Sequence, residues 1–176
     1  MRRLYVFLCL MILAICTACS SSPPPPASLV LTAMQEAMIE SGQPIPDGVV
    51  RLTASSAESP DHLTEVFFSA LYGEAARSLL NGDESTPPVG DAAMFLSLAA
   101  YPCELAVFRT SDVRTAKTVE RLCRERLDLL VQGYRESPWA EIPTRGIVRT
   151  KGCFVILVVA EDPLPIVRAA LGVIGT

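Results

Sequence analysis

The amino-acid sequence predicts a small α+β domain built on a mainly antiparallel sheet. Apolar runs of strand length occur in two pairs, and only a few turn-forming residues separate the two members of each pair, as in hairpins. A long amphipathic stretch lies between the pairs, and shorter helical patterns precede and follow them. We therefore expect two hairpins in one sheet, a long helix packed on one face, and helices near the N-terminus.

Two helical patterns precede the first predicted strand. Ser28 is a capping residue type, and apolar residues recur at helical spacing from there to Gly42. Residues 43–57 contain a glycine and two prolines and are predicted to form a loop. A second helix is expected to start at residues 59–61 (Ser-Pro-Asp), which supply a cap, a proline and an acidic residue in the order that helix starts favour. A short helix over residues 74–80 follows it.

The two predicted hairpins account for the strands. The first joins residues 93–99 to residues 104–109, and the second joins residues 147–150 to residues 153–160. Gly152 lies in the second turn, where a glycine readily supplies a positive φ. Residues 153–160 show no alternation of polar and apolar side chains, so we expect this strand to be central, with both faces covered.

The longest helix is expected to begin at Ser111 and Asp112 and to end near Gly133. Charged side chains occupy most of its surface, and one stripe is apolar and predicted to face the core. This stripe consists of Val113, Ala116, Val119, Leu122, Cys123, Leu127 and Leu130. A last helix is expected to begin at Asp162 and Pro163.

The first 18 residues have the pattern of a signal peptide. Arg2 and Arg3 give it a positive start, residues 4–18 are uncharged, and small residues precede Cys19. This arrangement resembles the bacterial lipobox, although Cys16 stands where a leucine is usual. We expect cleavage before Cys19 and lipidation of its thiol, and the alternatives are ordinary secretion with cleavage nearby or an uncleaved anchor helix.

The chain is therefore divided into three parts. Residues 1–18 are the predicted lipoprotein signal peptide, residues 19–28 the lipidated cysteine with a Ser- and Pro-rich tether, and residues 29–176 a single α+β domain. Four consecutive prolines in the tether favour an extended polyproline segment. Such a segment would hold the domain away from the membrane surface.

Charge argues against a nucleic-acid partner. Removing Arg2 and Arg3 from the 15 basic residues leaves 13 against 19 acidic ones, a net charge of −6. A negative domain repels phosphate backbones and gains nothing from anionic lipid headgroups.

Three cysteines, Cys103, Cys123 and Cys153, fall in the predicted domain. An odd number does not indicate a disulfide framework, and we expect all three to be small buried apolar groups. A disulfide between Cys103 and Cys153 is the alternative, if the strands that they begin lie side by side in parallel.

Few residues point to catalysis. His62 is the only histidine, and the domain has no Cys-x-x-Cys pair, so we expect no metal and no cofactor. His62 is expected to be an exposed structural residue in the first turn of its helix. Glu104 stands at the edge of an apolar strand and is expected to pair with Arg109, Arg145 or Arg149.

From Tyr72 onward, the order of features resembles DUF4358, a family of clostridial lipoproteins of unknown function. The resembling landmarks are Tyr72-Gly73, the run Glu104-Leu105-Ala106-Val107-Phe108, Tyr134 at the close of the long helix, Lys151-Gly152, and the strand from Val155 to Val159 before Glu161-Asp162. Among these landmarks, Glu104 and Tyr134 are the candidate site residues. The resemblance implies a lipid-anchored, surface-facing protein of Gram-positive bacteria, and it assigns no activity.

We therefore expect a non-enzymatic binding or interaction module, tethered by lipid to the outer face of the cell membrane. Its partner would be an envelope protein or a small ligand. Two alternatives are an extracytoplasmic hydrolase or thiol enzyme that uses Glu104, His62 or a cysteine, and a structural subunit of an envelope complex. A cleft with converging ionisable groups would favour the enzyme, and a flat exposed apolar patch would favour the subunit.

Overall fold

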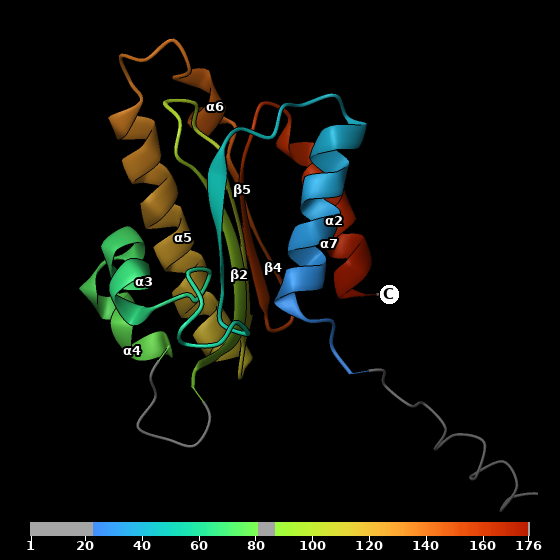
Figure 1. Cartoon of the computed structure of the whole chain (residues 1–176), viewed down its shortest axis with the longest axis vertical. Coiled ribbons are helices and arrows are strands. Elements are labelled where there is room, and N and C mark those ends of the chain that lie inside the picture. The colour runs from blue at the N-terminus through green and yellow to red at the C-terminus, as the bar shows by residue number, and fades with distance from the viewer. Residues whose placement is uncertain (1–22, 81–86, 176) are drawn as a thin grey trace, which may run out of the picture.

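The computed structural model of the chain describes residues 23–80 and 87–175 (Figure 1). Its elements in chain order are α2 (Ala27–Glu40), β1 (Gly48–Leu52), α3 (Glu65–Tyr72), a 3₁₀ turn (Glu74–Ala76), α4 (Arg77–Leu80), β2 (Val89–Ser97), β3 (Glu104–Thr110), α5 (Val113–Gly133), α6 (Glu141–Thr144), β4 (Ile147–Lys151), β5 (Phe154–Val159) and α7 (Pro163–Ile174). The predicted signal peptide and Cys19 lie outside the described residues. Within the described part of the chain, no helix combines the length and apolar character that crossing a membrane requires.

The described strands form one sheet of five, in the order β1-β2-β3-β5-β4. Every pairing between neighbouring strands is antiparallel, and β2 with β3 and β4 with β5 are the two predicted hairpins. Gly152 has φ 59° in the second turn. The α+β class and both hairpins are confirmed, as is the interior position of β5, whose six residues are all buried.

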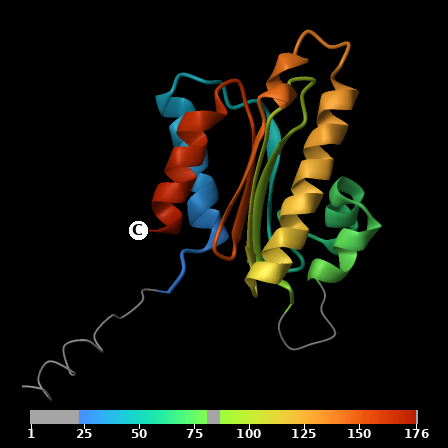
Figure 2. The same cartoon turned by 180° about the vertical axis from the view of Figure 1, so that it is seen from behind.

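Helices cover both faces of the sheet (Figures 1 and 2). α2 and α7 pack together on one face, whereas α5 lies across the other face with α3 beside it and α4 against β2. The side chains of each strand alternate between two cores. In β3, for example, Ala106 and Phe108 face α5, and Leu105 and Val107 face α2 and α7.

Strand β1 was predicted to be a loop, and this prediction is wrong. It is an edge strand paired only with β2, and none of its residues is fully buried, so it lacks the uninterrupted apolar run that predicted β2, β3 and β5. A Cβ at position 48 would lie 2.5 Å from the carbonyl oxygen of Leu96, so glycine is needed there for β1 to approach β2. The glycine that indicated a loop therefore serves close strand pairing.

Helix α3 begins later than residues 59–61. The backbone at Asp61 and Leu63 hydrogen-bonds Leu52 at the end of β1, so this segment follows the sheet instead of coiling. The cap is Thr64, whose side chain accepts a hydrogen bond from the amide of Phe67. His62 consequently lies before the helix and not in its first turn.

The other helix boundaries match the prediction closely. Asp112 caps α5 by accepting hydrogen bonds from the amides of Arg114 (2.7 Å) and Thr115 (2.9 Å). These bonds, the one from Thr115 first, lower the pKa of the Asp112 carboxyl. Asp162 caps α7 in the same way, ahead of Pro163.

The start of α2 is held by a residue distant in sequence. Ser28 does not cap this helix, which begins at Ala27 directly after the prolines. Instead, the buried amide of Ala27 donates to the carboxylate of Asp91 on β2, at 2.8 Å. Asp91 also accepts from Thr53 at 3.3 Å and lies 3.7 Å from the guanidinium of Arg109. Helix α2 thus begins at Ala27, which is completely buried.

Candidate functional site

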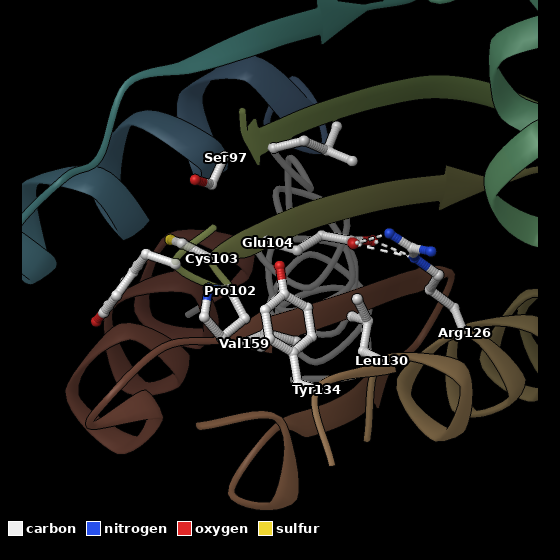
Figure 3. Close-up of a pocket in the computed structure, with 10 residues that line it drawn as sticks. Ser97, Pro102, Cys103, Glu104, Arg126, Leu130, Tyr134 and Val159 are labelled. Atoms are coloured by element: carbon white, nitrogen blue, oxygen red, sulfur yellow. Dashed lines mark hydrogen bonds and ion pairs between the residues drawn. The ribbon is translucent and has the colours of Figure 1, made fainter. Parts of the chain in front are cut away.

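A small pocket of about 50 Å³ lies at the end of the sheet where β2 ends and β3 begins (Figure 3). The hairpin loop between these strands, the end of β5 and the last turns of α5 supply its walls. Both candidate residues from the sequence, Glu104 and Tyr134, line it. The fold therefore brings together two residues that are 30 positions apart in the chain.

Glu104 lies at the base of this pocket in a buried ion pair with Arg126 of α5. Nε and Nη2 of Arg126 donate to Oε2 of Glu104 at 3.0 and 2.8 Å. The hydroxyl of Tyr72 donates to Oε1 at 3.0 Å. The side chain of Glu104 is only 3% exposed, so the hydrogen bonds from Arg126 and Tyr72 take the place of the water that would solvate it at the surface.

Pairing of Glu104 with an arginine was predicted, but the three proposed partners are wrong. Arg109 points to the opposite face of the sheet and lies near Asp91, and Arg145 pairs with Glu141. The correct partner is spaced four residues from both Leu122 and Leu130, within the apolar stripe of α5. An arginine at that spacing faces the core, and this was the signal in the sequence that could have identified it.

Tyr72, Glu104 and Arg126 influence one another's pKa values. Burial, followed by the negative charge of Glu104, raises the pKa of the Tyr72 phenol well above its usual value. Burial alone would lower the pKa of Arg126, but the charge and hydrogen bonds of Glu104 outweigh it and raise that pKa. The group is thus a neutral phenol beside an ion pair whose charges cancel.

This arrangement is unsuited to acid–base catalysis. Both oxygens of Glu104 accept hydrogen bonds from Arg126 or Tyr72, so neither is free to take a proton from a substrate. No other carboxylate is among the described residues that line the pocket. Glu104 therefore has no free oxygen for proton transfer.

One uncharged hydroxyl group, that of Tyr134, remains available beside Glu104. Tyr134 points its hydroxyl toward Glu104 (Figure 3), and within the described ranges it has no hydrogen-bond partner. Ser97 accepts a hydrogen bond from the amide of Ala99, and alternation along β2 places its side chain with Phe95 on the face of α2 and α7. Tyr134 is therefore the hydroxyl that can donate to a group bound beside Glu104.

One aromatic residue, Tyr101, lines the pocket on the hairpin side. Its ring meets that of Trp139 edge to face, with centroids 5.2 Å apart. The Tyr101 hydroxyl is buried without a hydrogen-bond partner among the described residues. Burial and the negative charge of Glu161 raise its pKa to about 12. The sequence did not predict this pair, since a tyrosine in a turn and a tryptophan after a helix give no sign that their rings are in contact.

His62 lies at the opposite end of the sheet. Its Nδ1 is 2.9 Å from the carbonyl oxygen of Ser55, and its backbone bridges Leu52. A hollow of about 430 Å³ lies beside it, between Thr53 and Leu80. His62 is therefore not brought together with Glu104.

A disulfide between Cys103 and Cys153 is ruled out by the register of the sheet. Cys103 directly precedes β3 and Cys153 directly precedes β5, and these neighbouring strands run antiparallel. The two thiols therefore lie at opposite ends of the strands, whereas a disulfide needs Cα atoms within about 7 Å. All three domain cysteines are free, and Cys153 is half-buried rather than fully buried as predicted.

We expect the three thiols to differ in reactivity toward iodoacetamide at pH 8. Cys153 should be labelled in the folded protein, whereas Cys103 and Cys123 should react only after unfolding. Burial, followed by the charge of Glu104, raises the pKa of Cys103 to about 12, and burial raises that of Cys123 well above its usual value. Mass spectrometry of tryptic peptides separates the three sites, and labelling of Cys103 in native buffer would contradict this expectation.

No group of three or more metal-ligating side chains that could hold an ion occurs in the part of the chain that the structure describes. No protein family, no curated protein sequence and no solved structure matches this chain.

Proposed function

We propose that the chain is a lipid-anchored binding protein on the outer face of the cell membrane, and that the pocket beside Tyr134 is its binding site. In this proposal the leader is removed, Cys19 carries the lipid, and the prolines connect it to the domain. The protein performs no chemistry on its ligand. The expected relation to DUF4358 stays a prediction that agrees with this role.

The observation that supports this proposal is the placement of the pocket relative to the prolines. The proline segment enters α2 beside Asp91 at one end of β2, and Ser97 lies in the pocket at the other end. Six residues at about 3.3 Å each separate them by about 20 Å. In Figures 1 and 2, α2 begins at one end of the sheet, whereas α6 and the C-terminal end of α5, which supplies Leu130 to the pocket, lie toward the other end. A membrane anchor at Cys19 therefore leaves the pocket open to ligands from outside.

The saturation of Glu104 favours binding over catalysis. A hydrolase would require a free base or nucleophile beside the substrate. The thiol that lines the pocket, Cys103, has a pKa near 12 and is therefore protonated at neutral pH. The neutral hydroxyl of Tyr134 and the ring of Tyr101 are features that support a recognition site.

The anchor is tested by fatty-acid labelling of cells that produce the full chain. We expect the wild-type protein to incorporate label and to sediment with membranes, and Cys19→Ala to lose the label. Cys153→Ala serves as the matched control and should be labelled normally, because it removes a thiol from the domain only. Cys16→Leu, which restores the usual lipobox residue, should also be labelled.

Two results would reject the anchor. One is incorporation of label into Cys19→Ala, and the other is a wild-type protein that mass spectrometry shows to begin with residues 1–18 joined to an unmodified thiol.

A further inference from the structure

The outer side of α2 and α7, which faces away from the sheet, is a helix surface without a partner (Figures 1 and 2). No other element among the described residues covers it. We propose that this surface is the interface between two copies of the chain, in which α2 of each copy packs against α7 of the other. This dimer goes beyond the binding role proposed above.

The composition of these two helices differs from that of α5 on the other face of the sheet. Arg168 is the only charged residue of α7, and α2 contains only Glu36 and Glu40. The large apolar side chains that the two helices expose are Leu29 (51%), Ile39 (64%) and Leu164 (57%). Helix α5, by contrast, exposes charged side chains of both signs along most of its length. A helix that is apolar on nearly every side is typical of one that is covered on every side.

Glu36 and Arg168 lie at the same level of this surface. Hydrogen bonds of 2.9 Å between the Gln43 side chain and the backbone of Asp162 join the end of α2 to the start of α7, so the packed helices are antiparallel. Glu36 lies about 6 Å before the end of α2, and Arg168 lies about 7.5 Å after the start of α7. Both side chains are exposed, and neither has an ion pair among the described residues.

These charges favour one of two simple dimer geometries. A two-fold axis parallel to the helices and placed between them brings α2 of one copy over α7 of the other without changing its level. Glu36 of each copy then meets Arg168 of the other copy, and two ion pairs form. A two-fold axis across the helices would instead bring α2 onto α2, and the like charges of the two acidic helices would repel each other.

The position of the tether favours the same geometry. An axis parallel to the helices keeps the starts of both α2 helices, and therefore both proline segments, at one end of the dimer. Two lipids on the two copies of Cys19 can then enter one membrane, and both pockets lie toward the other end. An axis across the helices would place the two tethers at opposite ends of the dimer.

The size of the surface suits a dimer that forms on a membrane. The helices are about 20 Å long and the pair is about 20 Å wide, so each copy contributes about 400 Å². This area is small for a permanent dimer in solution. Anchoring both copies in one membrane raises their effective concentration and thereby favours the contact.

A lipid surface fits these helices less well than a second copy does. Helices that lie on a membrane usually carry cations beside their apolar face, because cytoplasmic and bacterial lipid surfaces are anionic. Glu36 and Glu40 give α2 the opposite charge. A second copy, unlike a bilayer, supplies a cation at the level of Glu36.

The first test is disulfide crosslinking between two differently tagged copies of the full chain in the membranes of producing cells. One copy carries Glu36→Cys and the other Arg168→Cys, and both carry Cys153→Ala to remove the half-buried native thiol. We expect mild oxidation to give a dimer that contains both tags. Lys117→Cys in both copies, on the exposed side of α5, is the matched control and should give no dimer. The crosslink reports on this surface whether or not Cys19 carries lipid, so the dimer and the anchor fail separately.

The second test is charge reversal, with sedimentation equilibrium of the purified full chain in detergent as the readout. Glu36→Arg and Arg168→Glu should each weaken the dimer at least about tenfold, because each places like charges together. The double variant restores opposite charges and should dimerise within about threefold of the wild type. Lys117→Glu reverses a charge on α5 and should leave dimerisation unchanged.

Several results would overturn the proposal. These are a wild-type chain that stays monomeric throughout the concentration series, the absence of a crosslink between positions 36 and 168, and a double variant that stays as weak as the single ones. Equal weakening by Lys117→Glu would show an effect of overall charge and would also overturn it. A crosslink from either position to a different protein alone would assign the surface to that protein instead of a second copy.

Discussion

Replacing Arg126 with methionine is expected to lower the free energy of unfolding by about 3–5 kcal/mol. The substitution leaves Glu104, 3% exposed, with Tyr72 as its only partner among the described residues. A buried carboxylate without its cation pays the cost of desolvation without the compensating attraction. Urea unfolding followed by the fluorescence of Trp139, the single tryptophan, measures the change.

Two further variants show whether the loss comes from the unpaired charge. Arg124→Met removes an exposed arginine from the same helix and should change the unfolding free energy by less than about 0.5 kcal/mol. Glu104→Met combined with Arg126→Met removes both charges and should be at least about 1 kcal/mol more stable than Arg126→Met alone. If the double variant is no more stable than Arg126→Met alone, the charges are not coupled and the explanation is wrong.

The second large effect is expected from Asp91→Ala, at about 2–3 kcal/mol. This change removes the acceptor from the buried amide of Ala27 and leaves Arg109 without its nearby carboxylate. The first turn of α2 should open more often, since its first amide then has no partner. Hydrogen exchange at residues 27–31 is expected to accelerate more than exchange at β5.

Asp91→Asn is the control for this effect. Its amide oxygen can still accept from Ala27, so we expect a smaller loss of stability and slower exchange than in Asp91→Ala. Exchange at residues 27–31 that stays unchanged in Asp91→Ala would show that packing of α2 against α7, and not this hydrogen bond, fixes the helix start.

The regular elements of the fold were predictable because their signals are local. The long helix has its cap and its stripe within its own sequence, and β5 is apolar throughout because both of its faces are covered. Strand β1 was missed because its order comes from pairing with β2, which is distant in sequence. The start of α3 was misplaced because residues 61–63 follow the end of β1, although their composition favours a helix start.

The candidate site was only partly predictable for a related reason. Glu104 and Tyr134 were identified, but pairing with Arg126 depends on how α5 lies over the sheet, which the sequence of neither element determines. The same holds for the antiparallel neighbours β3 and β5, whose direction separates Cys103 from Cys153. Contacts between elements therefore account for most of what sequence patterns left open.

The bond between Ala27 and Asp91 has a mechanical consequence. Tension applied along the prolines does not act on α2 alone, because the first helical amide is joined to β2, an interior strand held by hydrogen bonds on both sides. A pulling force is therefore shared between the helix and the sheet at the point where it enters. Separating α2 from the sheet at this end requires breaking this buried bond first. The domain therefore resists unfolding by force applied through the proline tether.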